Sequence, residues 1–153
     1  MAPRVLIVDD DPDMLELLRQ ALSDAGYATV SAANGNEALQ MAKRSPPDVV
    51  VLDLLLPDMN GFSVCEQLRL SPATASVPVL MITVLPGQFP RMVGVEVGAD
   101  AYLNKPFRTE ELVSCVGDLL CGAGAVSEVG ADSEQFPVAP HGPGTFLRLG
   151  TPP

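Results

Sequence analysis

The sequence is poor in basic residues, and this scarcity narrows the function classes open to it. Among 153 residues there are 9 Lys and Arg against 19 Asp and Glu, which gives a formal net charge of −10. Surfaces that bind nucleic acid or anionic membranes need clustered cations, which this chain lacks. We therefore expect no direct contact with nucleic acid and no membrane attachment.

Long hydrophobic runs, a signal sequence and paired cysteines are absent as well. The longest apolar stretches, such as Val49–Leu52, are far too short to cross a bilayer. The first residues do not have the layout of a signal peptide. Three cysteines are an odd number without the spacing of a metal site. These absences favour a reduced, cytoplasmic protein.

The composition divides the chain into two parts. Hydrophobic residues make up 47% of the whole, enough for a buried core. Residues 122–153, however, hold 6 Gly and 5 Pro among 32 residues, and their apolar residues follow no sustained period. The sequence thus predicts a folded domain over 1–121 and a largely disordered tail or linker over 122–153. That segment could instead tether an output domain or dock on the folded part.

Apolar runs and helix signals alternate regularly through the first part. The sequence predicts five strands: buried, apolar ones over 4–8 and 49–53, a strand-like segment over 27–32, and further strands over 77–83 and 101–104. Capping residues, prolines and glycines predict five helices. Three begin at the caps Asp11, Asn34 and Thr109, one spans 62–70, and one lies between Pro90 and Gly98. Strict alternation predicts an α/β doubly wound (βα)5 fold, with a central five-stranded parallel sheet of flavodoxin-like order and helices on both faces.

In such folds functional groups gather at the carboxyl ends of the strands. Polar residues at these ends form a short set: Asp9, Asp10, Asp53, Thr83 and Lys105. Converging carboxylates repel one another and favour a bound cation, and oxygen ligands without His or Cys favour Mg²⁺. The alternative is that these acids are only solvated helix caps.

Asp53 is the best candidate for a nucleophile in this set. It follows a buried strand and precedes a loop that Pro57 and Gly61 keep out of a helix. A lysine, a Thr hydroxyl and Mg²⁺ around one carboxylate suit the neutralisation of a phosphoryl group. The carboxylate would then form an acyl phosphate.

The chain resembles the receiver domains of response regulators in two-component signalling. The matching segments are VLIVDDDPDML, VVVLDLLLPDMNG, VLMIT and GADAYLNKPF, and the resemblance runs from about Arg4 to Leu120. It implies that Asp53 accepts a phosphoryl group from a phosphohistidine of a sensor histidine kinase or a histidine phosphotransfer protein. It also implies that Asp10, Asp53 and the backbone carbonyl of Leu55 ligate Mg²⁺, while Asp9 acts through water.

The resemblance further implies a switch at the end of the sheet. Lys105 and Thr83 would contact the phosphoryl oxygens, and Thr83 would move together with Tyr102 to change a protein-binding face. Tyr102 could instead serve packing alone. The switch would bind a downstream protein partner or a missing output domain, and phosphorylation could produce a dimer.

The sequence also departs from the family pattern. Val84 replaces the usual Ala or Gly, and we expect its branched side chain to slow phosphotransfer. Leu55 and Leu85 are apolar where many relatives are polar, which predicts a long-lived phosphoryl group. The segment 85–91 contains two prolines and predicts a short fourth helix.

A phosphorylation-dependent signalling switch, rather than an enzyme acting on an outside substrate, is therefore the expected function. A phosphohydrolase of the haloacid-dehalogenase type is the alternative, since Asp9 and Asp11 superficially match its acidic motif. Asp13, however, replaces the hydroxyl residue expected after that motif. A degenerate receiver that acts as a scaffold is a further alternative, which the intact set of site residues disfavours.

Overall fold

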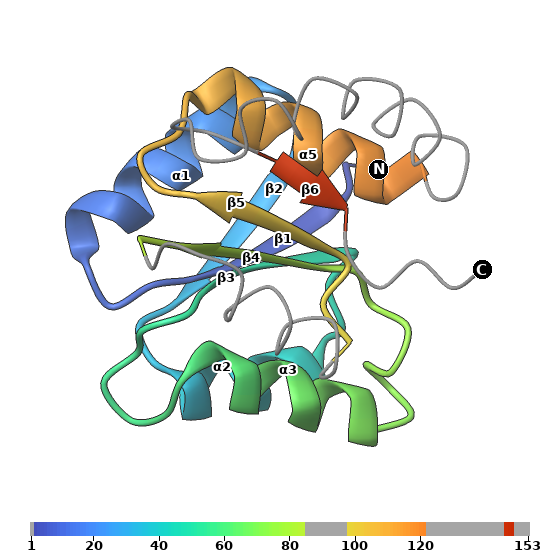
Figure 1. Ribbon diagram of the computed structural model, residues 1–153. Helices are drawn as coiled ribbons and strands as arrows, with labels where there is room; N and C mark the ends of the chain where they lie inside the picture. Colours follow the sequence, from blue (N-terminus) through green and yellow to red (C-terminus); the bar gives the residue numbers. More distant parts are fainter. Residues whose placement is uncertain (1, 85–97, 122–145, 149–153) are drawn as a thin grey trace.

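The structure, a computed structural model, describes residues 2–84, 98–121 and 146–148 (Figure 1). Its central sheet contains five parallel strands: β1 (Arg4–Val8), β2 (Ala28–Ala32), β3 (Val49–Asp53), β4 (Val79–Thr83) and β5 (Ala101–Asn104). They lie in the order β2-β1-β3-β4-β5. The predicted parallel α/β architecture and strand order are confirmed.

Four described helices cover the two faces of this sheet. They are α1 (Pro12–Asp24), α2 (Gly35–Arg44), α3 (Gly61–Leu70) and α5 (Thr109–Cys121). Figure 1 shows α1 and α5 on one face, and α2 and α3 on the other. Among the described residues, no helix has both the length and the hydrophobicity needed to cross a membrane.

Each face of the sheet has its own hydrophobic core, because side chains alternate along every strand. In β1, Val5 and Ile7 pack with residues of α1 and α5, whereas Leu6 and Val8 pack with residues of α2 and α3. Strands β3 and β4 are buried along their whole length. This explains why their sequences are continuously apolar rather than alternating.

Two of the predicted helix caps are confirmed and one is wrong. The carboxylate of Asp11 accepts the N–H of Asp13, and the side chain of Asn34 accepts the N–H of Glu37. Thr109, by contrast, is the first residue of α5 and not its cap. The preceding residue, Arg108, donates its N–H to the Glu111 carboxylate and accepts the N–H of Leu112 with its carbonyl.

A sixth strand lies on the outer edge of β5. β6 (Phe146–Arg148) pairs antiparallel with β5 and comes from the segment expected to be largely disordered (Figure 1). Its apolar residues had no periodicity that would have predicted a strand. The rest of the predicted tail, the predicted fourth helix and Leu85 lie outside the described residues.

Candidate functional site

The fold brings the acidic residues together at the carboxyl ends of β1 and β3. These two strands are neighbours, and Val8 lies opposite Leu52 in their parallel register. Asp9 and Asp10 therefore follow β1 directly beside Asp53, the last residue of β3. One carboxylate oxygen of each of the three residues lies within 4.8 Å of the others. The predicted acidic cluster is thus present in the structure.

Lys105 joins this cluster from the end of β5. Its Nζ lies 3.2 Å from Oδ2 of Asp9 and 3.3 Å from Oδ2 of Asp53. The side chain of Asp9 is fully buried, and those of Asp53 and Lys105 are only 8% and 16% exposed. The ammonium group consequently holds two carboxylates in a setting that screens charge weakly.

The surroundings of Asp53 disfavour the negatively charged form of its carboxyl group. Burial, followed by repulsion from Asp9, raises the pKa of the Asp53 carboxyl above its ordinary value. The Lys105 ammonium and the Leu55 N–H, which donates to Oδ1 of Asp53 over 3.3 Å, oppose this shift. A group that adds positive charge beside Asp53 would therefore favour the ionised carboxylate.

The residues present fit a hard divalent cation. Three carboxylates and one ammonium leave two negative charges in a space less than 5 Å across. The donors are all oxygen atoms, which suits Mg²⁺ better than zinc. Asp10 is exposed, so the cluster is open to solvent on its side.

The loop after Asp53 is closed on itself. The Gly61 N–H donates to the Leu54 carbonyl over 2.7 Å, and Leu55 forms an antiparallel bridge with Asn60. A Cβ at position 61 would lie 2.7 Å from the Asp53 carbonyl oxygen and 2.9 Å from Cα of Leu54. Only glycine therefore allows α3 to begin so close to the backbone of Asp53.

Asp58 anchors the same loop to the start of α2. Its two carboxylate oxygens accept the N–H groups of Gly35 and Asn36 over 2.8 and 2.9 Å. These bonds lower the pKa of the Asp58 carboxyl, because they favour its charged form. Sequence analysis did not identify this role, since no local pattern links residues more than twenty positions apart.

The role of Arg69 was not predicted from the sequence either. This residue holds the segment that leads into β5. Its guanidinium donates to the carbonyls of Ala75, Val77 and Gly98 and forms an ion pair of 2.8 Å with Asp100. The same oxygen of Asp100 accepts the N–H of Val79. Arg69 thereby connects the end of α3 with the starts of β4 and β5.

Thr83 and Tyr102 lie on neighbouring strands. In the parallel register of β4 and β5, Thr83 lies opposite Asn104 and Met81 opposite Tyr102. Both predicted switch residues are buried, with exposures of 0% and 1%. The Thr83 carbonyl accepts the Lys105 N–H over 2.7 Å, so β4 also supports the lysine that enters the acidic cluster.

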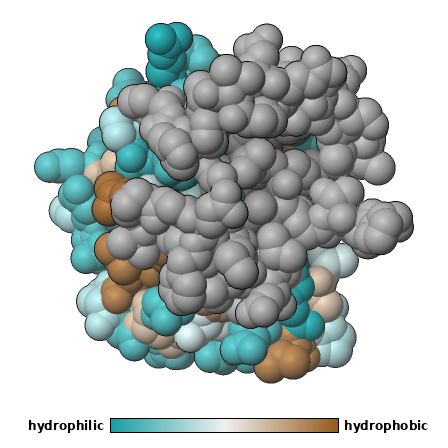
Figure 2. Space-filling model, in the orientation of Figure 1, coloured by the Kyte–Doolittle hydropathy of each residue, from teal (hydrophilic) through white to brown (hydrophobic). Residues whose placement is uncertain are grey.

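Apolar residues are exposed beside the strand ends. Leu55 lies two residues after Asp53 and is 50% exposed. Val84 directly follows Thr83 and is 59% exposed. Figure 2 shows hydrophobic atoms among hydrophilic ones on the left side of that view. Leu85, the other apolar departure from the family pattern, lies outside the described residues.

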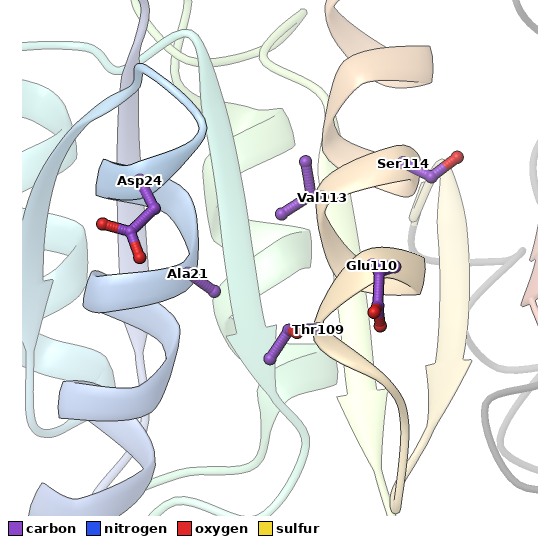
Figure 3. Close-up of a pocket in the computed structure, with 6 residues that line it drawn as sticks. All are labelled: Ala21, Asp24, Thr109, Glu110, Val113 and Ser114. Carbon is purple, nitrogen blue, oxygen red and sulfur yellow. The ribbon is translucent and has the colours of Figure 1, made fainter.

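A separate hollow lies between α1 and α5 (Figure 3). Ala21 and Asp24 of α1 line it together with Thr109, Glu110, Val113 and Ser114 of α5. None of the residues of the acidic cluster lines this hollow, and it contains no cation among its lining residues. The strand-end cluster is therefore the candidate site.

Comparisons with known proteins agree with this geometry. A family model described as the response regulator receiver domain matches residues 5–117. The chain is 40% identical over 132 residues to the DNA-binding dual master transcriptional regulator RpaA of Synechocystis, covering 86% of this chain and 55% of that protein. It is 37% identical over 136 residues to the alkaline phosphatase synthesis transcriptional regulatory protein PhoP of Bacillus subtilis, covering 89% and 54%. The chain thus spans about half the length of these curated relatives.

Solved structures give the same result. A putative response regulator from Chloroflexus aurantiacus matches with a TM-score of 0.76 and 40% identity, covering 79% of this chain and 99% of that one. Chemotaxis protein CheY4 of Vibrio cholerae matches with a TM-score of 0.74 and 33% identity, covering 76% and 98%. Almost the whole length of each of these chains thus aligns with about three quarters of this one.

Proposed function

This chain belongs to the family of response regulator receiver domains, and from that premise we propose that it is a signalling switch phosphorylated on Asp53. One observation carries the proposal. The Nζ of Lys105 bridges Asp53 and Asp9, within a cluster of three carboxylates at the strand ends. A buried carboxylate held by a lysine beside a cation site has the parts that phosphoryl transfer to an aspartate requires.

The proposed reaction transfers a phosphoryl group from a phosphohistidine. A carboxylate oxygen of Asp53 forms the new O–P bond, and the P–N bond breaks with its electron pair left on the imidazole nitrogen. Lys105 and the Thr83 hydroxyl bind the phosphoryl oxygens. Asp10, Asp53, the Leu55 carbonyl and, through water, Asp9 would hold Mg²⁺, which supplies positive charge against these oxygens when bound.

The proposed output of the switch passes through Thr83 and Tyr102. A phosphoryl group adds about −1.5 to −2 charge and three acceptor oxygens at Asp53. The Thr83 hydroxyl moves towards these oxygens, and the Tyr102 ring takes up the space that Thr83 leaves. Because both side chains are buried on adjacent strands, a small shift of one changes the packing of the other.

The proposed partners are a sensor histidine kinase, or a histidine phosphotransfer protein, and a downstream output. The relatives named above are transcriptional regulators, about half of whose length this chain spans. With a net charge of −10, this chain itself is poorly suited to bind DNA. The output therefore belongs to another domain or to a protein partner.

The test locates the phosphoryl group after the protein has reacted with a small phosphodonor. The purified protein is incubated with acetyl phosphate and Mg²⁺, and intact mass and peptide mapping locate the phosphoryl group. We expect one group on Asp53 in the wild type and none in Asp53→Asn. Asp11→Asn is the matched control, because Asn also caps helices, and it should be labelled like the wild type. Labelling of Asp53→Asn to the wild-type level would overturn the proposal.

The same purified protein can be used to distinguish a signalling switch from a phosphohydrolase. A phosphohydrolase would turn over p-nitrophenyl phosphate repeatedly, whereas the switch phosphorylates only itself. We expect no sustained release of nitrophenol by the wild type.

A further inference from the structure

The outer edge of β5 carries a strand that the receiver fold does not require. β6 pairs antiparallel with β5, with Ala101 opposite Arg148, Tyr102 opposite Leu147 and Leu103 opposite Phe146 (Figure 1). The family match ends at residue 117, and the putative response regulator from Chloroflexus aurantiacus aligns over 99% of its length with 79% of this chain. β6 is therefore an addition to a fold that is otherwise complete.

The β5 edge has the properties of a strand-docking surface. The last strand of a sheet presents a row of N–H and C=O groups that can pair with an extended segment. Natural edges are often protected by charged residues or proline, but the sequence of β5, Ala-Tyr-Leu-Asn, contains neither. Ala101, Tyr102 and Leu103 are all 1% exposed or less, so in this structure the strand is well covered.

β6 differs from the five core strands in ways that suit a displaceable segment. It has three residues, its pairing is antiparallel whereas the core strands pair in parallel, and residues 122–145 separate it from α5. Because these residues tether β6 to the domain, its pairing with β5 can form within one molecule. A ladder of three residues contains few hydrogen bonds, so it opens at a lower free-energy cost than the longer core strands.

The strand that β6 covers is also the strand that enters the acidic cluster. β5 ends at Asn104, and the next residue, Lys105, contacts both Asp53 and Asp9 through its Nζ. Leu147 pairs with Tyr102 itself. A change at the cluster and a change at the edge therefore act on the same four-residue strand.

We propose that the β5 edge is a docking surface for an extended segment, and that Phe146–Arg148 of this same chain occupies it as an intramolecular ligand. A downstream partner reaches this edge only after β6 leaves it. The trigger of this release rests on the proposed function. Phosphorylation of Asp53 shifts β5 through Lys105, and this shift lowers the fraction of molecules in which β6 is paired with β5.

Hydrogen exchange on the full chain tests the docking. Adjacent residues of a strand point their N–H groups to opposite sides, so Phe146→Pro/Leu147→Pro removes a ladder donor whichever side faces β5. We expect exchange in the peptide covering 101–104 to become about tenfold faster, while β1 and β3 stay protected. The control Val138→Pro/Ala139→Pro lies between Pro137 and Pro140 and should exchange like the wild type.

Two outcomes would overturn the docking proposal. One is equal protection of residues 101–104 in the wild type and both variants. The other is protection that rises with protein concentration, because it would identify a second copy as the occupant. If the proline variant also exposes β1 and β3, Phe146→Gly/Leu147→Gly replaces it, since glycine weakens a strand without removing its N–H groups. A peptide of residues 141–153 added in excess should restore protection to the variant, and a scrambled peptide should not.

The trigger is tested separately. Beryllium fluoride with Mg²⁺, which mimics a phosphoryl group, should speed exchange in β6 of the wild type but not of Asp53→Asn. An unchanged β6 in protein whose Asp53 is labelled by acetyl phosphate would overturn the trigger and leave the proposed function intact. Absence of any labelling would instead overturn the proposed function, while the proline comparison would still decide the docking.

Discussion

At the scale of single residues, Asp53 lies in surroundings that oppose its own charge. Its carboxyl is nearly buried and close to Asp9 and Asp10, and its pKa is raised by burial and by Asp9. A nucleophile with these neighbours is held in place by the fold at a cost in stability. Lys105 offsets part of that cost by pairing with two of the three acids.

We predict that Asp53→Asn raises the melting temperature in Mg²⁺-free buffer at pH 7 by a few degrees. A carboxyl whose pKa is raised on folding contributes most stability below its unfolded pKa, and this contribution is lost as pH rises through the folded pKa. The gain from the variant should therefore shrink as the pH is lowered towards 4. Thermal unfolding followed by circular dichroism at several pH values measures this effect.

Asp24→Asn is the control for this prediction, because Asp24 is exposed and lies outside the acidic cluster. It should leave the melting temperature nearly unchanged. A lower melting temperature for Asp53→Asn at pH 7 would contradict the prediction.

Val84 is the second residue whose effect can be isolated. It follows Thr83 and is 59% exposed, so its branched side chain stands in solvent beside the strand ends. We predict that Val84→Ala speeds labelling by acetyl phosphate several-fold, because a smaller side chain opens the approach to Asp53. Leu70→Ala, a similar truncation of a residue 78% exposed at the end of α3, should have no effect. Equal labelling rates for Val84→Ala and the wild type would refute the interpretation.

At the scale of elements, the start of α3 and the start of α2 together position the acceptor. Gly61 lets α3 begin against the backbone of Asp53, and Asp58 ties the intervening loop to Gly35 and Asn36 of α2. The acceptor strand is thus fixed by hydrogen bonds and close backbone contacts from the two helices on one face.

We predict that Gly61→Ala destabilises the fold by roughly 1–3 kcal/mol and slows labelling of Asp53, because the new Cβ would press on backbone atoms. Gly117→Ala is a matched control within α5, where the new Cβ would lie 3.5 Å from Oη of Tyr27, an ordinary contact. Since alanine favours helices over glycine by up to about 1 kcal/mol, this control should be neutral or stabilising. Urea unfolding of both variants gives the free energies, and similar values for the two would contradict the argument.

At the scale of the whole molecule, negative charge is concentrated where a cation would bind. The chain carries a net charge of −10, and three of its acids converge at one end of the sheet with a single described cation, Lys105, among them. A ligand that binds only the folded state stabilises it by mass action. Binding of Mg²⁺ should therefore be visible as global stability.

We predict that Mg²⁺ at a hundredfold excess over its dissociation constant raises the free energy of unfolding by about 2.7 kcal/mol. Asp10→Asn should lose most of this gain, because it removes a ligand from the exposed side of the cluster. Potassium chloride at the same ionic strength controls for screening of the net charge. The same gain in Asp10→Asn and the wild type would show that the cation acts elsewhere.

The sequence by itself determined the parallel fold and the members of the acidic cluster. Strands β1, β3 and β5 match the predicted ranges. β3 is the clearest case, because a strand buried on both faces reads as a continuous apolar run, here Val49–Leu52 before Asp53. Asp9, Asp10, Asp53 and Lys105 were found by one rule, that the ends of parallel strands share an edge. Both inferences use information that lies within a few residues along the chain.

Only the tertiary structure decided which distant groups meet. The bonds of Asp58 to α2, the contacts of Arg69 with Gly98 and Asp100, and the pairing of β6 with β5 join segments about twenty to fifty residues apart. The start of α5 depended on a local contact instead, because the Glu111 carboxylate accepts the N–H of Arg108 and Thr109 is already the first helical residue. Periodicity and capping patterns describe a chain's local preferences, whereas a hydrogen bond between distant segments requires the folded backbone to bring donor and acceptor within about 3 Å.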